Sequence, residues 1–164
     1  MQHAKPMITK KEPLPKKFRN LRNIIVIFCL ITFAISLPQI ALKVNDYNGP
    51  AEMHSFELFL VGGIAFLGGG IIETVIWLAN PLSLIAIIVF FKSDEICKVF
   101  SISALILSLI YIYWKKILAA ENGRMADIEE LCFGYWLWIT SILILNIGIF
   151  YYFLLYKKHK KHAA

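Results

Sequence analysis

The chain has 164 residues, of which 59% are hydrophobic and only 17% are charged, whereas a typical soluble domain is about 45–50% apolar and about 25% charged. The apolar residues form long runs almost free of charge, so the composition excludes an ordinary soluble domain and favours an integral membrane protein. The net charge of +6 lies mostly at the two ends of the chain. Basic residues that flank apolar runs favour contact with anionic lipid headgroups on the cytoplasmic side, and we expect no nucleic-acid partner.

Residues 1–22 are polar, rich in lysine and arginine, and interrupted by prolines, which predicts a disordered basic cytoplasmic tail. The uncharged run 23–42 has the roughly 20 residues that a helix needs to cross a bilayer core, so it is the first predicted span. Residues 43–57 contain the turn-forming sequence Asn48-Gly49-Pro50. We therefore expect an exposed loop between the first and second spans.

The next run, 58–91, is 34 residues long, and Glu73 is its only charged residue. It is too long for one upright crossing and short for two. Gly68–Gly70 and the Asn80-Pro81 pair are the natural points for a break. One arrangement places an interfacial or re-entrant segment at about 53–70 and a crossing helix at about 71–91, and we favour it. One long helix bent at the glycines is the other, and either arrangement implies a crevice near the glycines.

Two further spans are predicted over 99–120 and 131–156, and a second basic cytoplasmic tail over 157–164. If 58–91 makes one net passage, thirteen lysines and arginines lie inside and four outside, against ten and seven if it crosses twice. The positive-inside rule therefore favours the single passage. The predicted fold class is all-α: a polytopic inner-membrane helix bundle with four crossings, an irregular or re-entrant second element, and both termini in the cytoplasm.

A stripe of small and polar residues marks the second element. Ala65, Gly69, Glu73 and Trp77 recur every four residues, so they share one face wherever the segment is helical, and Asn80 joins that face. Ala65 and Gly69 form a small-xxx-small pair, which is typical of close helix packing. A carboxyl group in hydrocarbon costs at least about 2.5 kcal/mol, so we expect Glu73 to face protein or water.

Glu73 has two interpretations. It could handle protons or cations, or form the polar end of a small-ligand crevice. Alternatively, it is a structural carboxyl group that hydrogen-bonds another span or lies at the interface after the glycine turn, and this is the interpretation we favour. Asn146, inside the last predicted span, is a candidate partner for it. We expect Trp77 to pack or anchor at the interface, and Asn80 to cap a helix break.

Signatures of catalysis, metal binding or nucleotide binding are weak or missing in the sequence. Glu52, His54 and Glu57 lie close together, but their spacing fits no standard metal site, so we expect no metal or other cofactor. The cysteines are far apart, which predicts no disulfide framework. Because convergent catalytic side chains are lacking, we expect no enzymatic activity.

The element Trp77-Leu78-Ala79-Asn80-Pro81-Leu82 follows a glycine-rich apolar segment, and the aromatic cluster Tyr135-Trp136-Leu137-Trp138 opens the last predicted span. In these features the chain resembles a loose group of small uncharacterised bacterial multi-pass membrane proteins that have a mid-chain Trp-x-x-Asn-Pro element. The resemblance covers 58–91 and 131–145. It implies a bacterial multi-pass protein, with no particular activity attached.

The sequence leaves three function classes open. We expect a small accessory or regulatory membrane protein, of which an immunity protein against a membrane-active toxin is one kind, acting through helix–helix contacts with a protein partner or a second copy. The alternative is a proton- or cation-coupled transporter or channel subunit that uses Glu73. A membrane-embedded enzyme is the least favoured class.

Overall fold

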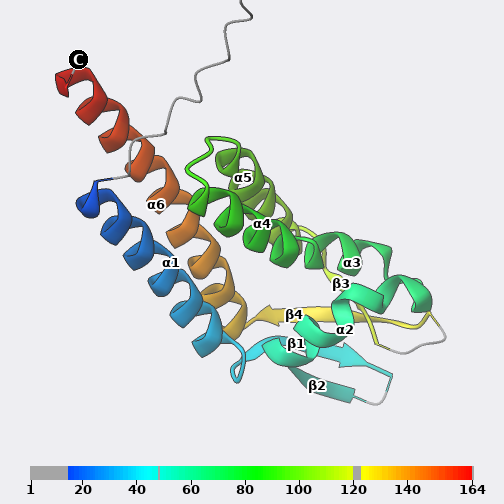
Figure 1. Ribbon diagram of the computed structural model, residues 1–164. Helices are drawn as coiled ribbons and strands as arrows, with labels where there is room; N and C mark the ends of the chain where they lie inside the picture. The colour runs from blue at the N-terminus through cyan, green and yellow to red at the C-terminus, as the bar shows by residue number, and fades with distance from the viewer. Residues whose placement is uncertain (1–14, 48, 120–122, 164) are drawn as a thin grey trace, which may run out of the picture.

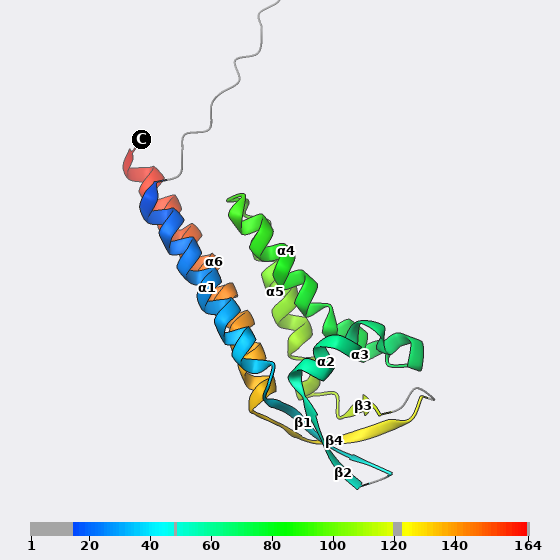
Figure 2. The same cartoon turned by 60° about the horizontal axis from the view of Figure 1, so that its bottom comes forward.

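The computed structural model describes residues 15–47, 49–119 and 123–163, and it has helices at one end and an antiparallel sheet at the other (Figure 1). The long helices α1 (Lys16–Ser36) and α6 (Phe133–Ala163) pack side by side along their length. A second pair is formed by α4 (Ala79–Phe91) and α5 (Cys97–Ser108). Figure 2 shows the two pairs as separate columns that meet near the sheet.

Three helical stretches, 16–36, 71–91 and 133–161, are long and apolar enough to cross a membrane. Shorter apolar helical stretches lie at 55–68 and 97–112. The α1–α6 contact is close because Gly148 of α6 lies against the side chain of Ile25 in α1. The core between the helix pairs is apolar and largely aromatic toward the chain ends, with Phe18, Phe90, Leu145, Ile149, Tyr152 and Phe153 all buried.

The prediction of an all-α fold is wrong in one respect, because the segments between the helices form a four-stranded antiparallel sheet in the order β2-β1-β4-β3. Strands β1 (Ile40–Asp46) and β2 (Gly49–His54) form a hairpin. Strand β4 (Met125–Leu131) pairs with β1 on one side and with β3 (Lys116–Leu118) on the other. Alternate side chains are buried, which is the pattern of a sheet with one covered face: Leu42 and Val44 of β1, Ala126 and Ile128 of β4.

Several helix bounds also differ from the predicted spans. Helix α1 begins at Lys16, so residues 16–22 are helical, while the rest of the predicted tail, 1–14, lies outside the described residues. Helix α6 continues to Ala163 through the predicted basic tail. Charged residues end the apolar run without ending the helix, because lysine and arginine are good helix formers. The predicted span 99–120 instead ends early, at α5 and the short 3-10 helix η2 (Ile110–Ile112), and its last residues form β3.

The run 58–91 forms two antiparallel arms. Helix α2 (Ser55–Val61) and the 3-10 helix η1 (Gly62–Gly68) make the outer arm. Gly69 then reverses the chain with a φ of +93°, a conformation that favours glycine. Helix α3 (Ile71–Trp77) returns along the first arm and leads into α4. An outer segment therefore precedes a helical stretch of crossing length at 71–91.

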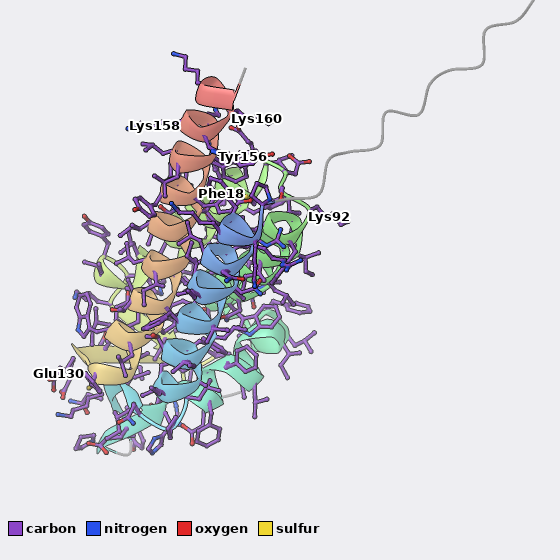
Figure 3. All side chains as sticks on the ribbon, turned by 60° about the vertical axis from the view of Figure 1, so that its left-hand side comes forward. Phe18, Lys92, Glu130, Tyr156, Lys158 and Lys160 are labelled. Carbon is purple, nitrogen blue, oxygen red and sulfur yellow. The ribbon has the colours of Figure 1, made fainter. Side chains whose placement is uncertain are left out.

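The described chain ends and the α4–α5 loop lie at the same end of the molecule. Lys157 of α6 forms an ion pair with Glu95 of the loop at 3.1 Å, and the Arg22 guanidinium of α1 donates to the Phe91 carbonyl at 2.8 Å. Figure 3 shows Lys92, Lys158 and Lys160 toward this end and Glu130 of β4 at the opposite end. The sheet therefore lies at the end of the helices opposite the basic C-terminal turns of α6 and the α4–α5 loop.

Candidate functional site: a crevice between the sheet and the helices

A cavity of about 290 Å³ lies where the sheet meets the helices. Its walls come from α1, β1, the α2–η1–α3 arms, η2, β3 and the start of α6, so segments far apart in the sequence build it together. Most of the lining is apolar or aromatic, and the polar side chains in it are few: Ser36, Ser55, Glu57, Glu73, Asn80, Tyr111, Tyr135. We call this cavity the crevice.

Glu73 lies in the first turn of α3 and is only 5% exposed. Its Oε1 accepts the backbone N–H of Leu118 in β3 at 3.1 Å. Strand β3 is an edge strand, and the next N–H, that of Ala119, donates to Arg124 on the β4 side. The Leu118 N–H therefore faces away from β4, and Glu73 supplies the partner that an edge strand otherwise lacks.

Two side chains of α3 hold the outer arm in place. The Trp77 indole N–H donates to the Phe59 carbonyl of α2 at 2.7 Å. The Thr74 hydroxyl accepts the Phe66 N–H at 3.0 Å and donates to the Gly62 carbonyl at 3.1 Å. Gly62 lies so close to the Trp77 ring that an added Cβ would be 2.7 Å from its Cδ1 atom. The glycines of this segment therefore let the two arms pack backbone against indole.

Asn80 links the second helix pair to the first. Its Oδ1 accepts the Trp138 indole N–H of α6 at 2.9 Å, and its Nδ2 donates to the Trp77 carbonyl at 3.1 Å. Both indoles and the amide line the crevice. The Asn80 side chain thus fixes α4 against α6 at the boundary of the cavity.

A second cavity of about 320 Å³ adjoins the crevice and shares five lining residues with it: Phe33, Phe59, Trp77, Asn80, Trp138. It lies among α1, α4 and α6, and we call it the groove. Beyond the shared residues its lining is almost wholly apolar or small, including Leu30, Leu84, Ile87 and Ile142. Crevice and groove are therefore adjacent cavities that share part of their walls. Carboxyl groups line the crevice toward the sheet, and the lining of the groove is mainly apolar.

The structure brings part of the predicted stripe together. Ala65, Glu73, Trp77 and Asn80 all line the crevice. The stripe is not one helical face, however, because Gly69 has a positive φ and separates η1 from α3. The predicted small-residue pair is likewise not a continuous packing face between helices.

Ala65 instead packs within the folded-back arms. A Cβ added to Gly70 would be 3.1 Å from the Ala65 Cβ, and the Gly70 N–H donates to the Ala65 carbonyl at 2.9 Å. The close approach that small residues permit is therefore used inside this chain, so these residues no longer indicate a contact with another protein.

Asn146 does not meet Glu73. Its Nδ2 lies 3.3 Å from the Ser101 hydroxyl of α5, where it crosslinks α5 and α6, while Glu73 bonds β3. Asn146 is two turns further along α6 than Trp138, on the side away from the sheet. The two polar groups lie at different depths because the helix carrying Glu73 begins at the sheet end.

Among the polar lining residues, the sequence did not predict Ser36, Ser55, Tyr111 and Tyr135. The Tyr135 hydroxyl donates to the Ser108 carbonyl at 2.8 Å and thereby joins α6 to α5. The Ser55 hydroxyl is buried and has no hydrogen-bond partner within the described part of the chain. The aromatic cluster at the start of α6 was the available signal for Tyr135, whereas Ser55 and Tyr111 carry no sequence signal.

Two of the three weak metal candidates, His54 and Glu57, have structural roles at the start of α2, whereas Glu52 lies in β2. Glu57 accepts the backbone N–H of His54 through Oε2 at 2.9 Å, and the two residues form a capping box at the start of α2. The His54 ring Nδ1 lies 3.2 Å from the Pro38 carbonyl oxygen. Over 15–47, 49–119 and 123–163, no group of three or more metal-ligating side chains comes together.

Ion pairs on the sheet fasten the strands to one another. Lys43 of β1 bonds Glu130 of β4 at 2.8 Å, and Arg124 bonds Asp46 at 2.8 Å. The hydrogen bond to Glu130 raises the pKa of Lys43 above its usual value. Both pairs therefore connect β1 with β4 or the residue just before it, and they stabilise the sheet that borders the crevice.

Comparisons of the chain with protein-family models, with curated proteins and with solved structures found no match.

Proposed function

We propose that this chain is a four-crossing membrane protein that crosses through α1, α3–α4, α5–η2 and α6, with both ends in the cytoplasm and the sheet outside. Three of these stretches have the length and apolar composition of a span. The fourth, 97–112, extends over about 24 Å and is close to the lower limit. Apolar side chains are exposed on the outer faces of all four, for example Phe28, Ile88, Ile106 and Ile147. This is the surface that lipid would cover.

The distribution of charge supports this orientation. Basic side chains dominate the end that carries the chain termini and the α4–α5 loop, and acidic ones dominate the sheet end. Cytoplasmic segments of membrane proteins are enriched in lysine and arginine. In the proposed orientation, the crevice therefore lies near the non-cytoplasmic surface of the membrane.

In this topology, the protein acts as an accessory membrane protein that binds an amphipathic molecule in the crevice and the groove. The observation that carries this proposal is the adjacency of the two cavities, which share five lining residues and together offer polar groups beneath the sheet and apolar side chains between the helices. Binding sites for small molecules have this character, being mostly apolar with a few placed polar groups.

The transporter alternative has less support. Beyond Asn80, the groove is lined mainly by aliphatic and aromatic side chains, so it offers an ion no continuous polar path. One oxygen of Glu73 is engaged with the Leu118 N–H, which gives this carboxylate a structural role. Association through the small-residue pair also has less support than the sequence suggested, because those residues pack within the chain.

Tryptophan fluorescence provides a direct test. The double variant Trp114→Phe and Trp136→Phe retains Trp77 and Trp138, which line both cavities. In phosphatidylcholine vesicles, titration with a long-chain alcohol brominated on its tail should quench these indoles with a saturable component. Adding Ser83→Phe should remove that component because residue 83 lines the groove.

Ser103→Phe is the matched control, since it makes the same change on α5 at a residue that lines neither cavity. It should leave the saturable component intact. Quenching that simply grows with the bromine content of the membrane, and that is equal in all variants, would refute binding in the crevice.

A further inference from the structure

The polar end of the crevice is acidic. Glu73 uses Oε1 for the Leu118 N–H, and among the described residues its Oε2 is left for another donor. Glu57 likewise uses only Oε2, for the His54 N–H. The described residues that line this cavity include neither lysine, arginine nor histidine. A negative headgroup would therefore be repelled by the buried Glu73 carboxylate, whereas a positive one would be attracted by it. Glu57 is exposed, so water weakens the attraction that it adds.

The Ser55 hydroxyl is a further polar group at this end of the crevice. The buried Ser55 hydroxyl has no hydrogen-bond partner in the described part of the chain, and it lines the same cavity as the two carboxylates. Burying a hydroxyl without a hydrogen bond is unfavourable, which favours an occupant with polar atoms at this end. Oxygen acceptors at this end suit a headgroup that carries several N–H donors.

The junction of crevice and groove is suited to the start of an alkyl tail. Trp77 and Trp138 both line it, and their indole rings offer a large apolar contact area. From there the groove continues past Leu30, Leu84 and Ile87 between the helix pairs. A headgroup at Glu73 would thus place an attached alkyl chain in the groove.

We propose that the occupant is a single-chain amphiphile with an amine headgroup, held with its ammonium group at Glu73 and Glu57 and its alkyl tail in the groove. This inference rests on the proposed binding function and specifies the ligand class. It makes the headgroup charge the property that the crevice selects, and the tail the source of most of the contact area.

Three probes with identical brominated tails can test this: a primary amine, an alcohol and a carboxylic acid. Their saturable quenching of Trp77 and Trp138 is measured in phosphatidylcholine vesicles, with each concentration corrected for the fraction of probe in the membrane. We expect the amine to bind about tenfold more tightly than the alcohol, or more, and the acid to bind most weakly. Glu73→Gln combined with Glu57→Gln keeps acceptor oxygens at both positions and should bring the amine close to the alcohol.

The outcomes separate the two proposals. Equal binding of the three probes, or tightest binding of the acid, would overturn the amine inference and leave binding in the crevice intact. The absence of any saturable quenching would overturn both. The three headgroups are compared in the protein that lacks Trp114 and Trp136 but keeps both glutamates. Because this comparison changes no residue that lines the crevice, it decides the question even if the double glutamine variant folds poorly.

Discussion

Replacing Glu73 with leucine should detach β3 from α3. The substitution introduces an apolar side chain of similar size. It removes the carboxylate oxygen Oε1, which accepts the Leu118 N–H at 3.1 Å. A buried N–H group left unpaired costs about 1–3 kcal/mol. For a chain of this size, each kcal/mol corresponds to about 2–4 °C in Tm. Because Leu118 is only half-buried, we expect a loss in the lower part of this range.

Glu73→Gln is the matched control, because its amide oxygen still accepts the same N–H, so it should retain most of the stability. Thermal unfolding of the purified protein in detergent micelles gives the difference in Tm, and hydrogen exchange reports the Leu118 amide directly. Exchange at Leu118 should be faster in the leucine variant than in the glutamine variant. If both variants unfold at the same temperature with equal exchange, the carboxylate does not hold β3 and the structural argument for Glu73 fails.

Three further predictions concern packing, polar contacts and orientation. Gly134→Ala should destabilise the protein by about 1–3 kcal/mol in thermal unfolding, because the new Cβ would lie 2.8 and 2.9 Å from two backbone carbonyl oxygens. Gly148→Ala should also destabilise the protein, because the new Cβ would overlap the Ile25 Cγ2 atom and β-branched isoleucine has little rotamer freedom in a helix. Trp138→Phe removes the N–H that Asn80 accepts and should cost about 0.6–1.7 kcal/mol, measured in the same way. Burial and a nearby carboxylate raise the pKa of the Cys132 thiol, so a membrane-impermeant maleimide should label it from outside intact cells more slowly than a free thiol, at a rate that increases with pH. Labelling of Cys132 only after permeabilisation would contradict the proposed orientation.

The apolar runs predicted the positions of the long helices because burial and membrane insertion both select uncharged residues. The sheet could not be predicted in the same way. Strand β4 carries Asp127, Glu129 and Glu130, so it reads as a polar loop, and only Ala126 and Ile128 alternate as a half-buried strand would. Its pairing with β1 joins segments that are separated in the sequence by four α-helices and two 3-10 helices, which local patterns do not reveal.

The candidate site was predicted in part for a related reason. The i, i+4 spacing of Ala65, Gly69 and Glu73 assumes a continuous helix, and the positive φ of Gly69 breaks that assumption. The later stripe residues, Glu73, Trp77 and Asn80, lie together as predicted because α3 leads directly into α4. The favoured interpretation of Glu73 was a hydrogen bond to another span. Glu73 does form a hydrogen bond to another element, but the donor is the Leu118 N–H at the edge of β3, which is a strand and not a helical span.

Several polar side chains between the helices have structural roles. Asn80 with Trp138 and Asn146 with Ser101 each crosslink two helices, and Tyr135 bonds the α5 backbone. These groups are engaged in holding the bundle, and polar contacts of this kind stabilise helix association in membranes. Among the described lining residues, one carboxylate oxygen each of Glu73 and Glu57 and the Ser55 hydroxyl are left for an occupant. Under the proposed function, these oxygens would attract and orient a headgroup.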